Sequence, residues 1–99
     1  MTPEIIYKDT SEFAEYEALN REYRADVTVK IGDKMYQVYI TTMIRLQQDF
    51  ETEIQDSGYY IPEPNIIIVK EVTKQEIESI VNKLYRCRYF ERLDHNGFL

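Results

Sequence analysis

The side chains in this chain best able to do chemistry are carboxylates, and they gather in one stretch. Residues 49–63 contain no lysine or arginine and five acidic residues, which are Asp49, Glu51, Glu53, Asp56 and Glu63. Two carboxylates can act as the acid and the base of glycoside hydrolysis, but one of them then needs an apolar pocket that raises its pKa. Nothing in the sequence indicates such a pocket, and a chain of 99 residues seldom has room for one. We therefore expect a binding surface and no enzyme.

The remaining reactive residues are too few for a catalytic or metal centre. Cys87 and His95 are the only cysteine and the only histidine. Nucleophilic catalysis needs a base beside the nucleophile, and a structural zinc needs four ligands. The three glycines are isolated, so no glycine-rich phosphate loop is present. We expect no catalytic residue, metal or cofactor, and we interpret Cys87 as a small core or helix-end residue.

Two interpretations of the acidic stretch stay open at this stage. It is either a solvated helix face that keeps the protein soluble or a surface for a partner. If the stretch is helical, Asp49, Glu53 and Asp56 fall on one stripe, where like charges repel and no lysine lies nearby to offset them. Tyr59 and Tyr60 lie beside that stripe, and tyrosine is a favoured anchor at protein interfaces. The predicted partner-binding residues are Asp49, Glu53, Asp56, Tyr59 and Tyr60.

The net charge of −6 narrows the class of partner. Nucleic acids and anionic membranes would be repelled, so a basic protein is the expected partner. A lone cysteine forms no internal disulfide, and residues 1–9 lack the pattern of a secretory signal. The longest aliphatic run, Ile66 to Val69, is far too short to cross a bilayer. The sequence thus favours a cytoplasmic protein, and its length favours a single domain over residues 1–99.

The N-terminal quarter predicts a strand and then a helix. Ile5, Ile6 and Tyr7 favour a short strand, and the spacing from Asp9 to Glu12 is that of a capping box with Asp9 as the cap. The helix is expected to run to about residue 23. Its apolar residues recur at three- and four-residue steps and should face the core; they are Phe13, Tyr16, Leu19 and Tyr23.

Residues 25–40 give the clearest strand signal, because apolar and polar residues alternate on both sides of Gly32-Asp33. A two-residue turn that begins with glycine suits type II′. The predicted cross-strand pairs are Val29 with Tyr36, Val27 with Val38 and Ala25 with Ile40. The opposite face of this hairpin carries a mixed set of side chains, including Met35 and Tyr39, suited to water or to a partner.

The middle of the chain leaves one ambiguity. Residues 42–56 fit a helix capped by Thr41 or Thr42 and ended by Gly58, although a strand also fits the first few residues. We favour the helix, with an apolar stripe of Met43, Leu46, Phe50 and Ile54. Two prolines make residues 59–65 a loop. The β-branched run from Ile66 to Val69 then predicts a central strand buried on both faces.

The C-terminal part predicts a helix from Thr73, where Thr73 and Glu76 form a capping box, to about Arg86. Residues 89–93 favour either a docked strand or a continuation of that helix, and residues 94–99 a flexible tail. A basic patch of Lys83, Arg86, Arg88 and Arg92 offers a contact for the acidic stretch of a second copy. The predicted fold class is α+β, with a small mixed sheet, a hairpin and a central aliphatic strand packed against two or three helices.

This plan resembles that of small acidic bacterial toxin-immunity proteins. The resemblance covers about residues 25–90 and is carried by the hairpin with Ile31-Gly32-Asp33, the strand from Ile66 to Val69 and the capped helix from Thr73 to Arg86. It assigns a role to no individual residue. It implies a stoichiometric inhibitor that blocks a basic toxin or effector without turnover. Phage-encoded inhibitors of host defence nucleases share the outline, and a homo-oligomeric structural or accessory subunit is the alternative of a different class.

Overall fold

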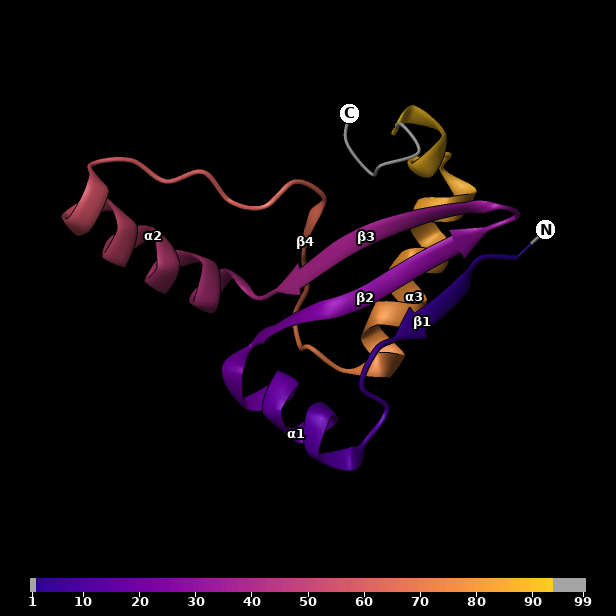
Figure 1. Cartoon of the computed structure of the whole chain (residues 1–99), viewed down its shortest axis with the longest axis horizontal. Helices are drawn as coiled ribbons and strands as arrows, with labels where there is room; N and C mark the ends of the chain where they lie inside the picture. The colour runs from indigo at the N-terminus through magenta and orange to yellow at the C-terminus, as the bar shows by residue number, and fades with distance from the viewer. Residues whose placement is uncertain (1, 94–99) are drawn as a thin grey trace.

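The computed structural model describes residues 2–93 and contains a four-stranded mixed sheet with three α-helices and one 3₁₀-helix in that range (Figure 1). The elements in chain order are β1 (Glu4–Tyr7), α1 (Glu12–Arg21), β2 (Tyr23–Ile31), β3 (Lys34–Thr41), α2 (Met43–Ser57), β4 (Ile66–Ile68), α3 (Lys74–Arg86) and η1 (Phe90–Arg92). The predicted α+β class is confirmed. No helix within residues 2–93 is both long and apolar enough to cross a membrane.

The strands lie in the order β1-β2-β3-β4, antiparallel except for the parallel pair of β3 and β4. The hairpin of β2 and β3 has the predicted register near its turn, with Val29 opposite Tyr36 and Val27 opposite Val38. Gly32 has a φ of 63° and Asp33 has no positive φ, in keeping with a type II′ turn. A bulge between Arg24 and Val27 shifts the register farther on, so Ile40 pairs with Arg24 and the predicted pair with Ala25 is wrong.

The core lies between one face of the sheet and α3, which Figure 1 shows behind the strands. Val27, Val29, Val38 and Ile40 from the hairpin are fully buried there, as are Ile77 and Val81 from α3. The predicted cap of α3 is confirmed, because Thr73 Oγ1 accepts a hydrogen bond of 3.2 Å from the Glu76 amide. The short helix η1 closes this core, and the centroid of its Phe90 ring lies 5.4 Å from that of the Tyr36 ring.

Neither of the two predictions for residues 89–93 is right. The segment is a short 3₁₀-helix that buries Phe90 and Leu93, because a single tight turn lets both side chains reach the core. Cys87 is exposed at the C-terminal end of α3, as a helix-end residue. His95 and the predicted tail, residues 94–99, lie outside the described residues.

The first helix differs from its prediction in its cap and in its buried face. The N-cap is Ser11 and not the predicted Asp9, because Ser11 Oγ accepts a hydrogen bond from the Ala14 amide at 3.1 Å. The Asp9 carboxylate instead accepts from the amide of Ser11 itself, in the loop before the helix. The predicted core residues Phe13, Tyr16 and Leu19 are all exposed. Ala18 is buried instead, because only small side chains let this helix approach β2 closely. Tyr23 is not helical but begins β2.

The aliphatic run at Ile66 is not a central strand. β4 contains Ile66–Ile68, pairs only with β3 and forms an edge of the described sheet. Ile68 is 46% exposed, whereas Val69 and Val72 beyond the strand enter the core. The run is all apolar because buried residues continue beyond a very short strand. A central strand buried on both faces would give the same pattern, so the sequence alone does not separate the two cases.

This correction changes the expected effect of a charge in β4. Ile68→Asp is expected to lower the free energy of unfolding by less than about 1 kcal/mol, as for other surface sites. The matched Val38→Asp places a carboxylate in the core, where Val38 is 0% exposed, and should abolish cooperative melting. Thermal melting followed by circular dichroism compares the two. Loss of the melting transition in the Ile68 variant would support the original prediction of a central strand buried on both faces.

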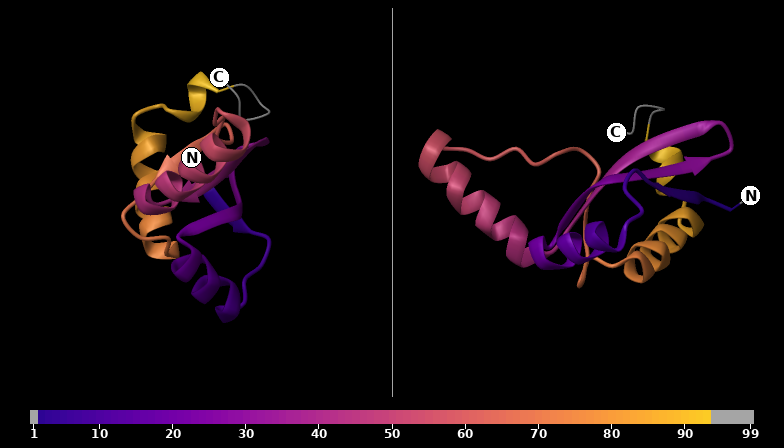
Figure 2. Two further views of the ribbon diagram at one scale, coloured as in Figure 1. Left: turned by 90° about the vertical axis from the view of Figure 1, so that its left-hand side faces the viewer. Right: turned by 60° about the horizontal axis from the view of Figure 1, so that its bottom comes forward.

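The ambiguity over residues 42–56 resolves in favour of the helix. Thr42 caps α2 by accepting from the Arg45 amide at 3.2 Å, and Gly58 ends it with a φ of 81°. In a usual β-α-β crossover the helix packs over the sheet. Here α2 connects the parallel strands β3 and β4 but runs away from them, as Figure 1 and the right view of Figure 2 show. The sheet therefore holds α2 only at its base.

Candidate partner-binding site

The part of the molecule that projects from the sheet is formed by α2 and by the segment 58–65, which returns to β4. We call residues 43–65 the arm. Figure 1 and the second view in Figure 2 show that α2 and the returning segment meet at the tip of the arm and diverge toward the sheet. Asn65 anchors the end of the returning segment next to the sheet, because its carbonyl accepts from the Tyr39 amide at 3.2 Å and its side chain donates to the Gln37 carbonyl.

Arg45 fastens the base of the arm to the end of α1. Its Nη1 donates to the Arg21 carbonyl at 2.9 Å, one of the last carbonyls of that helix, where the macrodipole favours a cation. Its guanidinium also lies over the Tyr23 ring, 5.1 Å from the ring centroid. The Thr42 amide donates to the Glu22 carbonyl at 3.1 Å. These contacts set the direction in which the arm leaves the sheet.

A groove of about 620 Å³ lies between α2 and the returning segment. We call it the arm groove. Its lining residues include three tyrosines, three carboxylates and one arginine; these are Tyr23, Tyr59, Tyr60, Asp49, Glu53, Glu63 and Arg45. Four of the five predicted partner-binding residues thus lie together, namely Asp49, Glu53, Tyr59 and Tyr60. Asp56, the fifth predicted residue, is not among the residues that line the groove.

The expectation that no cation offsets the acidic stripe is wrong. Arg45, one turn before Asp49, donates from Nε to both oxygens of that carboxylate at 3.0 and 3.2 Å. The pair has the i, i+4 spacing that stabilises a helix by a few tenths of a kcal/mol. Glu53 and Asp56 have no ion-pair partner within residues 2–93. The acidic surface that faces solvent therefore centres on these two side chains and on Glu63.

Two residues that were not among the predicted partner-binding residues complete the groove, Tyr23 and Glu63 from opposite walls. The Tyr23 hydroxyl donates to Glu63 Oε1 at 3.3 Å across 40 positions of the chain. Burial, together with the charge of Glu63 and this hydrogen bond, raises the pKa of Tyr23 to about 12. Burial likewise raises the pKa of Tyr60, with Asp49, Glu63 and Glu53 adding to the shift. The groove therefore resists a further negative charge and favours a positive one.

The raised pKa of Tyr23 gives a measurable consequence. Stability from the neutral Tyr23 hydroxyl is complete below its ordinary pKa of 10.0 and is lost as the pH rises toward 12. We expect one of the nine tyrosines to ionise near pH 12 in a tyrosinate absorbance titration and Tyr23→Phe to remove that component. Tyr16→Phe, on the exposed side of α1, should leave it in place. An unchanged titration in the Tyr23 variant would contradict the contact with Glu63.

The apolar stripe of α2 lies beside the arm groove and is uncovered. The described parts of the chain bury no residue of α2, and three of its large apolar side chains are exposed: Met43 by 60%, Phe50 by 47% and Ile54 by 38%. The Phe50 ring meets Tyr60 edge to face at 6.3 Å, which joins the stripe to the groove. On the returning segment Ile61 is 80% exposed. An apolar face of this kind, bordered by polar groups, is typical of an interaction site.

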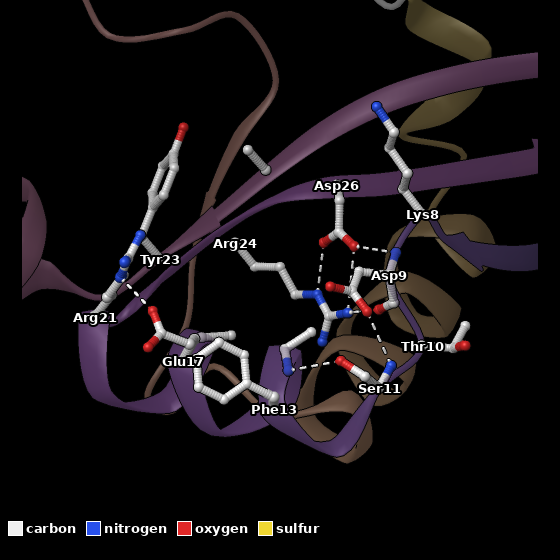
Figure 3. A pocket seen from close by; sticks show the side chains of 13 residues that line it. Lys8, Asp9, Thr10, Ser11, Phe13, Glu17, Arg21, Tyr23, Arg24 and Asp26 are labelled. Atoms are coloured by element: carbon white, nitrogen blue, oxygen red, sulfur yellow. Dashed lines mark hydrogen bonds and ion pairs between the residues drawn. The ribbon is translucent and has the colours of Figure 1, made fainter.

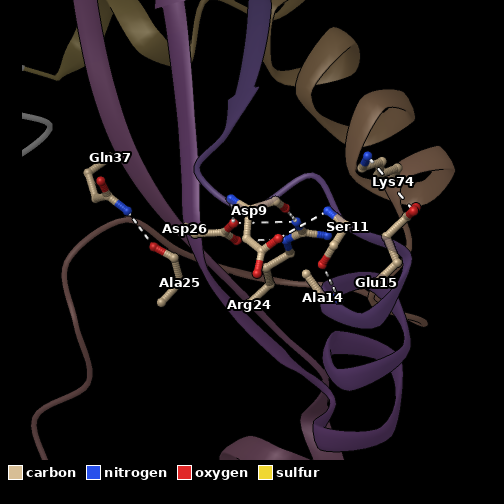
Figure 4. A network of polar contacts seen from close by, with 9 residues as sticks. All are labelled: Asp9, Ser11, Ala14, Glu15, Arg24, Ala25, Asp26, Gln37 and Lys74. Atoms are coloured by element: carbon tan, nitrogen blue, oxygen red, sulfur yellow. Dashed lines mark hydrogen bonds and ion pairs between the residues drawn. The ribbon is translucent and has the colours of Figure 1, made fainter.

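A second concavity, of about 910 Å³, lies between α1 and the start of β2 (Figure 3). Apart from Lys8, its charged side chains have partners within the described residues. Arg24 donates from Nε to Asp26 Oδ1 at 2.7 Å, and Arg21 pairs with Glu17 at 2.7 Å. Figure 4 shows Asp9 completing the Arg24 network by accepting from Nη2 at its carbonyl, 2.8 Å away. These groups hold β2 to the loop before α1 and offer little to a ligand.

Within residues 2–93, no group of three or more His, Cys, Asp or Glu side chains is placed to hold a metal ion. Comparisons of the chain with family models, with curated proteins and with solved structures found no match.

Proposed function

We propose that this protein is a non-enzymatic binding module that holds a basic protein partner with its arm and blocks that partner stoichiometrically, as an immunity protein blocks a toxin. One observation carries the proposal. A 15-residue helix with four large apolar residues at helical spacing buries none of its residues in the described chain and lies beside an acidic groove. A partner would cover this helix.

The energetics of α2 favour this function. Isolated helices of about 12–15 residues are marginal in water, so most helices depend on packing an apolar face. Three of the carboxylates, Glu51, Glu53 and Asp56, also lie in the C-terminal half of α2, where the macrodipole disfavours negative charge. The sequence of α2 is thus poorly suited to a free helix and well suited to one that binds apolar and cationic groups of a partner.

Charge and apolar anchors would divide the work of binding. The net charge of −6 and the open carboxylates of the arm would steer a basic partner and raise the association rate. Phe50, Tyr59 and Ile61 would then lose their contact with water and slow dissociation. Each fully buried side chain of this size contributes about 1.5–3 kcal/mol. No bond is made or broken, so inhibition would follow from occlusion alone.

A homo-oligomeric structural subunit is the second candidate, and the basic patch favours it. Lys83 and Arg86 lie at the C-terminal end of α3, Arg92 lies in η1 and Arg88 lies between the two helices, which Figure 1 shows on the opposite side of the molecule from the arm. A contact between the patch of one copy and the arm of the next would be head-to-tail and would form a ring or a filament. A phage-encoded inhibitor of a host defence nuclease would need the same arm chemistry as an inhibitor of a toxin, and only the partner's identity separates these two.

Affinity capture from the native host tests the proposal. The tagged chain is compared with Phe50→Ala/Ile54→Ala on the arm and with Met35→Ala, a matched exposed apolar residue on the outer face of the hairpin. We expect the wild type and the Met35 variant to retain one basic protein in a 1:1 ratio and the arm variant to lose it. Retention by the arm variant, with loss by the Met35 variant, would move the interface to the hairpin. Recovery of further copies of the chain alone would favour the structural subunit.

A further inference from the structure

We infer that the segment recognised by the arm is a basic amphipathic α-helix, which lies along the apolar stripe of α2 and places a lysine or arginine side chain in the arm groove. The inference rests on the proposed function and adds the chemistry and the conformation of the partner. The stripe is formed by Met43, Leu46, Phe50 and Ile54, three of which are exposed and one half-buried.

The geometry of the stripe selects a helix. At 3.6 residues per turn its four side chains lie within an arc of about 80°, along a helix about 22 Å long. Such a narrow ridge packs between the side-chain ridges of a second helix. An extended segment binds by adding to a sheet edge, and the arm contains no strand, since α2 is followed by an irregular segment up to residue 65. A strand laid here would leave its own backbone groups unpaired.

The charges beside the stripe select a basic helix. Glu53 lies next to the stripe on the groove side, and Glu51 lies beyond Ile54 on the other side, so carboxylates border it on both flanks, as the e and g positions border a coiled-coil seam. In α2, Arg45 and four acidic residues give +1 − 4 = −3. A second copy of α2 would bring the same −3 to this face, and an anionic lipid surface would be repelled in the same way. A lysine- or arginine-bearing helix is the occupant with complementary charge.

The arm groove shows how a cationic side chain would be held. Arg45 in its wall already has its guanidinium over the Tyr23 ring and on the Asp49 carboxylate. Glu53 on the same helix and Glu63 on the returning segment form no ion pair with the described chain, and both tyrosines of the returning segment, Tyr59 and Tyr60, line the same space. A side chain reaching over Phe50 enters beside Tyr60, which touches Phe50 edge to face. It would there meet aromatic faces and carboxylates together.

A peptide-display selection tests the inference without the natural partner. Random 16-residue peptides are selected on the immobilised chain and counter-selected on the Phe50→Ala/Ile54→Ala variant. We expect the enriched peptides to carry apolar residues at three- and four-residue steps and to have a net positive charge. A synthetic copy of the best peptide should bind the Glu53→Lys/Asp56→Lys variant at least tenfold more weakly than the wild type, and the Asp33→Lys control within about twofold, because Asp33 lies in the hairpin turn.

Several outcomes would overturn the inference. Enriched peptides that are acidic, or whose apolar residues alternate with period two, would replace the basic helix by another ligand. Equal binding to the arm variant would remove α2 from the site. Sedimentation of the free protein as a dimer that Phe50→Ala/Ile54→Ala dissociates would show that a second copy covers the stripe. If affinity capture finds a basic partner on the arm whose cross-links to α2 come from a non-helical segment, the proposed function stands and only this inference fails.

Discussion

Arg24→Ala is expected to lower the free energy of unfolding by about 2–4 kcal/mol, as for other ion pairs broken in a largely buried setting. The Arg24 side chain is only 4% exposed; it binds the Asp26 carboxylate and the Asp9 carbonyl and lies over the Tyr7 ring at 4.5 Å. Its loss leaves a half-buried carboxylate without its cation. Chemical denaturation measures the change, and Arg21→Ala is the matched control because its pair with Glu17 is exposed and such pairs contribute at most about 1 kcal/mol.

The pH dependence separates the ion pair from simple packing. Burial would raise the pKa of Asp26, but the hydrogen bonds from Arg24 and the Asp9 amide and the charge of Arg24 outweigh it and hold the pKa below 3.8. The stabilisation by this carboxylate is therefore complete above pH 3.8 and is lost as the pH falls through the lower folded-state value. The difference between wild type and Arg24→Ala should shrink on acidification. A difference that is constant down to the acid transition would assign the loss to packing alone.

The second large effect is expected in binding. Phe50→Ala/Ile54→Ala should weaken partner affinity by about 30- to 1000-fold, since two interface anchors typically contribute about 2–4 kcal/mol together. Stability should change by less than about 1 kcal/mol, because both side chains are exposed in the free protein and alanine favours the helix. Calorimetric titration and thermal melting measure the two quantities. A large loss of stability with unchanged affinity would mean that the stripe serves the fold.

Local signals in the sequence predicted the elements well. The capping box at Thr73 and Glu76 and the alternation around Gly32 are complete within a few residues, so helix α3 and the turn-proximal register of the hairpin follow from them. The bulge at Ala25 and Asp26 has no such local signal, because it depends on Arg24 reaching the Asp9 loop. It is a tertiary contact that shifts the register.

Side-chain burial was less predictable than the elements. The spacing of Phe13, Tyr16 and Leu19 is helical, but which face of α1 is buried depends on the close approach that Ala18 allows. The run at Ile66 predicts a strand, but its place in the sheet depends on the connection through α2, which brings it beside β3 at an edge.

The candidate site was predictable in part. Tyr59 and Tyr60 come directly after the end of the acidic helix at Gly58, so the turn there places them near Asp49 and Glu53. The pairing of Arg45 with Asp49 could also have been found, because their spacing of four is a standard helical signal. The contact of Tyr23 with Glu63 spans 40 positions and needs the folded sheet.

Hydrogen exchange of the α2 amides, measured with and without the captured partner, tests most directly whether the arm is the binding site. In the free protein α2 should exchange faster than α3 or the β2–β3 hairpin, because it buries no residue in the described chain. The partner should slow exchange across residues 43–57 and change the outer face of the hairpin little. Protection confined to the hairpin face, with α2 exchanging as fast as in the free protein, would contradict the account.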